Sequence, residues 1–129
     1  MRRTLHACQK LVPDSDGGIT ILGYHLVGAG TGSPIDLSLE IFQRQMEELS
    51  RFAEVSELNR ALERLGQSPP IQDPLVVLTF DDGYENFYDN AWPVLQEYRF
   101  PAALYVQVDF LADHQRAPIR NVGRLRPLS

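Results

Sequence analysis

A short strand that is apolar on both faces is the feature of this sequence that most restricts its fold. Residues 75–80, Leu-Val-Val-Leu-Thr-Phe, are apolar at nearly every position and lack the alternation of a strand with one wet face. Such a strand needs cover on both sides, as in a parallel α/β sheet or barrel. It stops abruptly at Asp81, Asp82, Gly83 and Tyr84. The sequence therefore predicts a buried strand with two acidic residues at its carboxyl end.

Further strands are expected on both sides of this one along the chain. Residues 19–25 are apolar and β-branched and run into a glycine-rich loop. A brief extended piece is expected over residues 53–55. Residues 101–108 form the next expected strand after the acidic pair. All of these segments are short, as strands of a single sheet usually are.

Helices are expected between the strands. Ser38 can cap a helix through about Phe52, whose apolar residues recur at helical spacing. A second, shorter helix is expected between Ser56, as its cap, and Gly66, and a third over 86–99 with a late start or a kink at Pro93. Strands that alternate with helices predict the α/β class, with a parallel sheet and right-handed crossovers.

The composition fits one globular domain. The chain has 129 residues, of which 43% are hydrophobic, enough for a sizeable core. Its apolar runs are only a few residues long, so no transmembrane segment is expected. The single cysteine, Cys8, excludes an internal disulfide. No apolar segment long enough for a signal peptide precedes that cysteine, so we expect none in this chain.

The charge changes sign towards the C-terminus. The formal net charge is -5, yet residues 116–129 contain four arginines and no Asp or Glu. We therefore expect an N-terminal extension over residues 1–18, a domain over 19–112, and a basic tail over 113–129 that is not part of the fold. Because the body of the chain is acidic, nucleic-acid binding is not expected.

The adjacent acids, Asp81 and Asp82, are the strongest candidate for chemistry. Successive side chains of a strand point to opposite faces, but a turn at Gly83 would let both carboxylates reach the mouth of the sheet. Ligands of parallel α/β folds bind at that mouth, and two neighbouring acids can divide into a metal ligand and a proton acceptor. The alternative is that one aspartate caps the following helix while its neighbour is solvated. Spacing alone favours neither interpretation.

Three segments of the chain resemble one known family. Residues 79–84, Thr-Phe-Asp-Asp-Gly-Tyr, resemble the first signature of the polysaccharide deacetylases, the NodB-homology or carbohydrate esterase family 4 group. Residues 21–27 are similar to the opening strand of that family, and residues 100–106 to the strand after the signature. The resemblance covers about residues 19–111, so the expected domain resembles the N-terminal portion of a polysaccharide deacetylase domain.

What the resemblance implies is a distorted (β/α) barrel that removes N-acetyl, sometimes O-acetyl, groups from an acetylated polysaccharide. The family uses one divalent metal ion, often zinc. By resemblance Asp81 would match the general base and Asp82 the aspartate ligand of the metal. His25, at the end of the first expected strand, and Tyr84 are candidates to line the pocket, although a structural role for His25 is equally compatible with its position.

The sequence also departs from the family pattern. Two histidines in an H-x-x-x-H pair complete that metal site, whereas His6, His25 and His114 are not spaced by four. A complete barrel takes about 200 residues or more. We therefore expect an incomplete site, from a truncated or frameshifted gene product or a partial gene prediction, and no acetate release by this chain alone. An incomplete sheet also leaves an unpaired edge, through which the chain could self-associate.

Two other functions are compatible with parts of the sequence. The first is a non-catalytic half-barrel that binds a glycan or a partner. The second is a receiver-type phosphoacceptor domain, which is disfavoured because Lys10 is the only lysine and such a domain needs one late in the chain. Family members often work outside the cell or in its envelope, while this chain shows no signal peptide, so no compartment is assigned.

Overall fold

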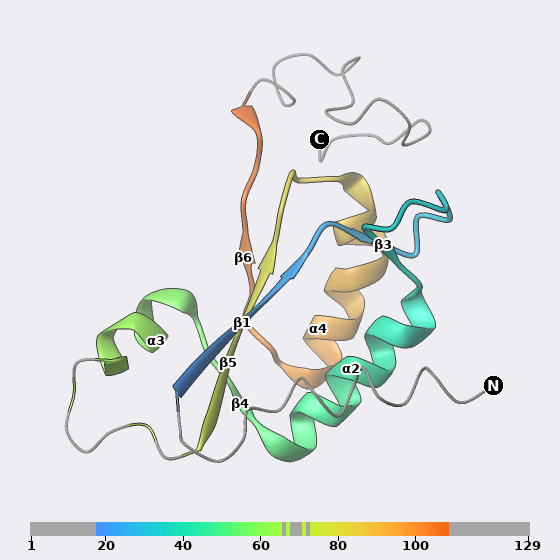
Figure 1. Ribbon diagram of the computed structural model, residues 1–129. Coiled ribbons are helices and arrows are strands. Elements are labelled where there is room, and N and C mark those ends of the chain that lie inside the picture. Colours follow the sequence, from blue (N-terminus) through green and yellow to red (C-terminus); the bar gives the residue numbers. More distant parts are fainter. Residues whose placement is uncertain (1–17, 66, 68–70, 72, 109–129) are drawn as a thin grey trace.

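The computed structural model describes residues 18–65, 67, 71 and 73–108 (Figure 1). Residues 1–17 of the expected N-terminal extension and the whole of the expected basic tail, 113–129, lie outside the described residues. Within the described part, no helix is long and apolar enough to cross a membrane.

A parallel sheet forms the centre of the structure, and β5 (Pro74–Phe80) is its middle strand. On one side β5 pairs along its whole length with β1 (Gly18–Tyr24). On the other side it pairs with two short strands in turn, β4 (Glu54–Val55) near its start and β6 (Ala103–Leu104) at its end. All these pairings are parallel, which confirms the predicted fold class.

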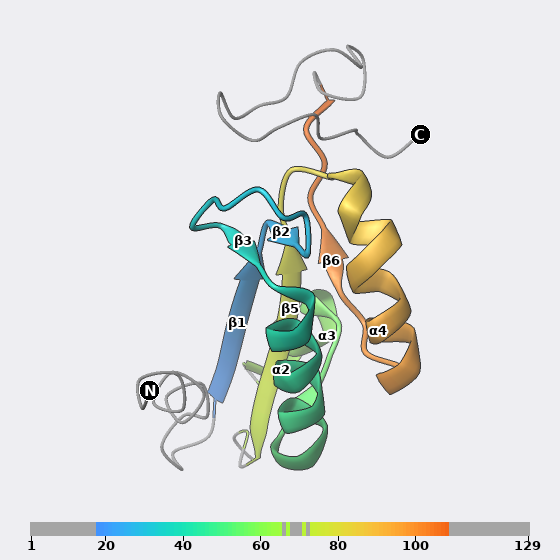
Figure 2. The ribbon, with the colours of Figure 1, turned by 90° about the vertical axis from the view of Figure 1, so that its right-hand side faces the viewer.

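Helices cover both faces of β5, as its apolar sequence predicts (Figure 2). Val76, Leu78 and Phe80 face the main core, which contains buried residues of α2 (Leu39–Phe52) and α4 (Trp92–Tyr98). The alternate residues, Leu75 and Val77, pack with Ala61 of α3 (Leu58–Leu65) on the opposite face. A strand between two helical layers has no solvent-exposed face, and this explains the unbroken apolar sequence of β5.

The predicted first helix is confirmed as α2. Ser38 is its N-cap, and the hydroxyl accepts a hydrogen bond from the backbone N–H of Ile41 at 3.3 Å. Phe42, Met46 and Leu49 are buried, so the residues at helical spacing form the inner face. This helix follows a small second sheet, in which β2 (Leu26–Val27) pairs with β3 (Asp36–Leu37).

The expected helix over 86–99 is present from Glu85 to Tyr98 and contains a π-helical turn. A π-helical turn, η1 (Phe87–Ala91), precedes α4, and Pro93 lies within the first two residues of α4. Proline has no N–H to donate to the preceding turn, and the regular hydrogen-bond pattern is interrupted in that turn. Arg99 ends α4 in the left-handed conformation, with φ 55°.

The last expected strand is shorter than the sequence predicted. Residues 101–108 were expected to be extended throughout, whereas β6 contains only Ala103 and Leu104. The reason is its partner, because β6 pairs with the last two residues of β5, and β5 ends at Phe80. Beyond that point the chain of β5 turns, so the residues that follow β6 have no strand to pair with there.

Candidate functional site at the carboxyl edge of the sheet

The two aspartates lie in a tight turn at the carboxyl end of β5. The backbone N–H of Asp81 still donates to the carbonyl oxygen of Tyr24 at 2.9 Å, so Asp81 continues the pairing with β1. Asp82 and Gly83 then both adopt left-handed backbone conformations, with φ 74° and 72°. We call residues Asp81, Asp82 and Gly83 the acid turn. The predicted turn at Gly83 is therefore present, and it begins one residue earlier.

His25 lies beside the first carboxylate of the acid turn. Its Nε2 is 3.7 Å from Oδ2 of Asp81, and the two side chains are 38% and 40% exposed. This separation is too long for a hydrogen bond, so the contact is one of charge when the imidazole is protonated. Parallel pairing of β1 and β5 explains the contact, because equivalent strand ends bring their next residues to the same edge of the sheet.

Asp82 is held from two sides by groups that carry no charge. Nε2 of Gln107, from the segment after β6, donates a hydrogen bond to Oδ1 of Asp82. Tyr84 lies in a small buried cluster with Leu26 and is itself 1% exposed. Burial raises the pKa of Tyr84 to about 12, with further contributions from the charge of Asp82 and a side-chain hydrogen bond to it. The phenol therefore stays protonated beside the carboxylate.

Both the left-handed backbone at position 83 and the nearby side chain of Val106 favour glycine there. A β-carbon at this position would lie 2.8 Å from Cγ1 of Val106. The same segment donates from the backbone N–H of Tyr105 to the carbonyl oxygen of Phe80 at 2.8 Å. The chain after β6 thus lies directly against the acid turn.

The structure decides against helix capping by the aspartates. Helical structure after the acid turn begins at Glu85, and residues Phe87–Ala91 of it form the π-helical turn η1. Neither Asp81 nor Asp82 occupies the capping position. Both aspartates precede the helix and lie at the carboxyl edge of the sheet.

Three polar side chains that the sequence did not single out fix the loop beside the acid turn. The amides of Asn86 and Asn90 both donate to the carbonyl oxygen of Val27, at 3.0 and 2.8 Å. The carboxylate of Asp36 accepts hydrogen bonds from the backbone N–H groups of Ala29 and Thr31, at 3.1 and 2.7 Å. A turn-forming Asp in a glycine-rich region was the only sequence signal for this arrangement.

One cavity beside the sheet reaches His25 of the site. A cavity of about 440 Å³ is lined by His25 together with Tyr24, Asp36 and Gln45. His25 therefore contacts Asp81 and also borders this cavity. Tyr84, the other candidate for lining a pocket, is buried below the acid turn instead of bordering this space.

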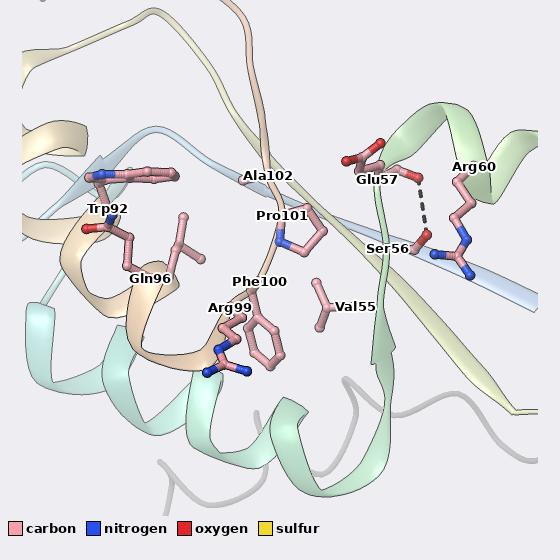
Figure 3. A pocket seen from close by; sticks show the side chains of 11 residues that line it. Val55, Ser56, Glu57, Arg60, Trp92, Gln96, Arg99, Phe100, Pro101 and Ala102 are labelled. Atoms are coloured by element: carbon pink, nitrogen blue, oxygen red, sulfur yellow. Dashed lines mark hydrogen bonds between the residues drawn. The ribbon is translucent and has the colours of Figure 1, made fainter.

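A second cavity, of about 810 Å³, is shown in Figure 3. Residues of α3, α4 and the segment before β6 line it, among them Arg60, Trp92 and Pro101. Neither aspartate of the acid turn is among its lining residues. This cavity lies between β4 and β6. Both of these strands pair with the same edge of β5, so the sheet has a gap there.

The described residues do not complete a metal centre by themselves. Among them, no group of three or more His, Cys, Asp and Glu side chains is arranged to hold an ion. A catalytic zinc site normally takes three protein ligands. Asp81 faces His25 while Asp82 is bonded by Gln107, so the acidic groups have different neighbours.

Comparison with known proteins agrees with this geometry. The family model described as polysaccharide deacetylase matches residues 68–123, which include the acid turn. A poly-β-1,6-N-acetyl-D-glucosamine N-deacetylase from Escherichia coli (strain K12) is 52% identical over 33 residues, which are 26% of this chain and 5% of that protein.

Solved structures share the fold. IcaB from Ammonifex degensii has a TM-score of 0.60 and 26% identity, and the match covers 71% of this chain and 39% of that one. The Streptococcus pyogenes deacetylase PplD, solved in complex with acetate, has a TM-score of 0.65 at 21% identity, over 78% and 47% of the two chains. This chain spans less than half the length of each of these relatives.

A parallel sheet with helices on both faces and an acid turn at its carboxyl edge defines the class, part of a NodB-type α/β barrel. Within that class, the chain resembles the N-terminal portion of the polysaccharide deacetylase family. The relatives from E. coli and S. pyogenes are deacetylases by name, and deacetylation is a hydrolysis.

The close approach of Val106 predicts an unusually costly substitution at Gly83. Gly83→Ala should lower the free energy of unfolding by about 2 to 4 kcal/mol, from left-handed strain together with overpacking. Gly30→Ala is the matched control, because Gly30 has φ 68° and no atom lies within 4 Å of the place that an added β-carbon would take. It should cost only about 1 kcal/mol. Urea unfolding followed by circular dichroism measures both.

A double variant isolates the contact with Val106. Val106→Ala removes the atom nearest to the added methyl group, so it should recover part of the loss in Gly83→Ala. Equal losses in Gly83→Ala and Gly30→Ala would mean that backbone strain alone explains the glycine.

The high pKa of Tyr84 predicts a pH effect above the ordinary range of tyrosine. A pKa raised from 10.0 to about 12 stabilises the fold fully below pH 10, and this contribution is lost as the pH rises towards 12. The difference in absorbance at alkaline pH between wild type and Tyr84→Phe should titrate near 12. Asp82→Asn should lower that midpoint, since it removes the negative charge. A midpoint near 10 in the wild type would contradict the burial of this phenol.

Proposed function

We propose that this chain provides the acidic part of a glycan deacetylase site, with Asp81 as general base and Asp82 as ligand of a divalent metal ion. The observation that supports the proposal is the acid turn, which stands at the carboxyl edge of a parallel sheet and inside the segment matched by the family. Ligand sites of parallel α/β folds form at this edge. Removal of an acetyl group requires an acid–base group there.

The surroundings of the two carboxylates support a division of roles. Asp81 has one neighbour of variable charge, His25, and it borders the open side of the turn. A base in this place can take up a proton and return it, and the imidazole can balance its charge. Asp82 is instead fixed in orientation by neutral donors, which suits a ligand that must present its oxygen in one direction.

Zinc is the first choice for the cation. When bound, such an ion would supply Lewis-acid chemistry to the acetyl carbonyl. Because the described residues do not hold a complete set of ligands, its remaining ligands belong to residues outside them. The proposal for this chain therefore concerns Asp81, Asp82 and His25, and not a complete metal site.

The proposed substrate is a polymer that contains N-acetylglucosamine. The E. coli relative is named for the N-deacetylation of such a polymer, and its similarity to this chain is 52% over 33 residues. We favour an N-acetyl over an O-acetyl group for this reason. A glycan fits the half-exposed edge better than a small buried ligand does, since both His25 and Asp81 are open to solvent.

A hybrid enzyme tests the role of Asp81. Residues 19–108 would replace the equivalent part of the E. coli deacetylase, which supplies the ligands that the described residues lack. The hybrid with zinc should release acetate from β-1,6-linked N-acetylglucosamine oligomers. Asp81→Asn should lower the rate by a factor of about 10² to 10⁴. Asp89→Asn, an exposed acid on η1, is the matched control and should leave the rate unchanged.

The outcomes separate catalysis from binding. Acetate release that survives Asp81→Asn would show that another group is the base. An inactive but folded hybrid, together with oligomer binding by this chain alone, would favour the non-catalytic half-barrel. Zinc-dependent acetate release by the chain alone would overturn the expectation of an incomplete site.

We also propose that the chain self-associates through β1. Within the described residues, β1 pairs on one side only, with β5, and its Ile21 side chain is 54% exposed. An unpaired, apolar edge strand is a template for pairing with another chain. The exposed edge of β1 therefore favours pairing with β1 of a second copy of the protein.

Sedimentation velocity checks the self-association. The wild type should show a concentration-dependent dimer, and Ile21→Lys should shift it to monomer because a charge on an edge strand opposes pairing. Ile41→Lys adds the same charge on α2, away from the edge, and should leave the dimer intact. A wild type that is monomeric at every concentration would rule the association out.

A further inference from the structure

Three successive residues of the segment after β6 contact the end of β5 and the acid turn. The backbone N–H of Tyr105 donates to the carbonyl oxygen of Phe80, where β5 ends. The side chain of Val106 lies in the space that a β-carbon on Gly83 would fill. The amide of Gln107 then donates to the carboxylate of Asp82. The segment therefore packs against both Asp82 and Gly83 of the acid turn.

The carboxylate of Asp82 needs such a contact. Asp82 has a left-handed backbone, with φ 74°, and directly follows the acidic residue Asp81 in the sequence. Neighbouring negative charges repel each other, and a half-exposed side chain can rotate away from its neighbour. The phenol of Tyr84 lies on the buried side of this carboxylate. Gln107 comes from a different part of the chain and gives the Asp82 carboxylate a second hydrogen bond.

The geometry points to Gln107 as the positioning residue that fixes the orientation of the Asp82 carboxylate. This inference rests on the proposed function, in which Asp82 presents an oxygen to a cation. A ligand carboxylate is commonly held by a hydrogen bond from a residue that does not touch the ion. Gln107 occupies that place in this chain.

The chemistry of the amide suits this role. The side-chain amide of glutamine donates through its NH₂ group without bringing a charge. It therefore orients Asp82 while the carboxylate keeps its full negative charge for a cation. Lysine or arginine at the same place would offset that charge and compete with the ion. Because Gln107 is exposed, its loss should leave the overall stability nearly unchanged.

Two NMR measurements on the full chain test the inference. The first, without metal, follows the side-chain amide signals of Gln107. A hydrogen bond to a carboxylate should move one of the two protons downfield, and Asp82→Gly should return it to the usual position. Glycine is the appropriate replacement because it adopts φ 74° without strain.

The second measurement adds Mn²⁺ alone and follows the paramagnetic broadening of the backbone amides of Asp82 and Gly83. Gln107→Leu, which keeps the volume but not the donor, should require about tenfold more Mn²⁺ for the same broadening. Val108→Ala is the matched control, since Val108 lies on the same segment and is 77% exposed. It should behave as the wild type, and all variants should unfold at the same temperature.

The outcomes distinguish the positioning role from the proposed function. An amide signal of Gln107 that does not respond to Asp82→Gly overturns the inference. Equal Mn²⁺ broadening in wild type and Gln107→Leu also overturns it. A responsive amide with no Mn²⁺ broadening in the wild type supports the contact while it contradicts the proposed metal role of Asp82. A responsive amide with the tenfold shift supports both.

Discussion

The parallel pairing of β5 with β1 is the interaction on which the rest of this structure depends. It joins residues at the start of the described chain to residues near its middle, along the whole length of both strands. The pairing aligns the two carboxyl ends, so that His25 and Asp81 meet although neither contributes to the strands themselves. Helical layers on both faces then exclude water from β5. The site is therefore a consequence of strand register.

The acid turn has an unfavourable backbone conformation, and contacts from other parts of the chain hold it in place. Two consecutive left-handed residues are unfavourable for an aspartate and acceptable for a glycine. The turn persists because β1 holds Asp81 and the segment after β6 holds Gly83 and Asp82. Local strain of this kind is found where surrounding structure determines it, and such places are often functional.

The sequence predicted most of the fold and only part of the site. The lack of alternation in residues 75–80 predicted a strand covered on both faces, and Ser38 marked the start of α2, because both signals are local. The predicted length of β6 was wrong, because the observed length depends on where β5 turns. The places of Asp81, Asp82 and His25, though not their proposed roles, were predicted from strand ends. Gln107 and Asp36 were not, because their contacts depend on loop conformations that no periodicity encodes.

The distance along the chain between β1 and β5 also matters while the protein is being made. Each residue of β1 pairs with one about 56 positions later, so this strand leaves the ribosome before its partner exists. At typical rates of synthesis, the delay is about 3 to 11 s. During that interval an apolar strand is exposed to water, to other nascent chains and to chaperones. Early handling by the translation machinery, as much as the final packing, would then determine how much of this protein reaches its native form.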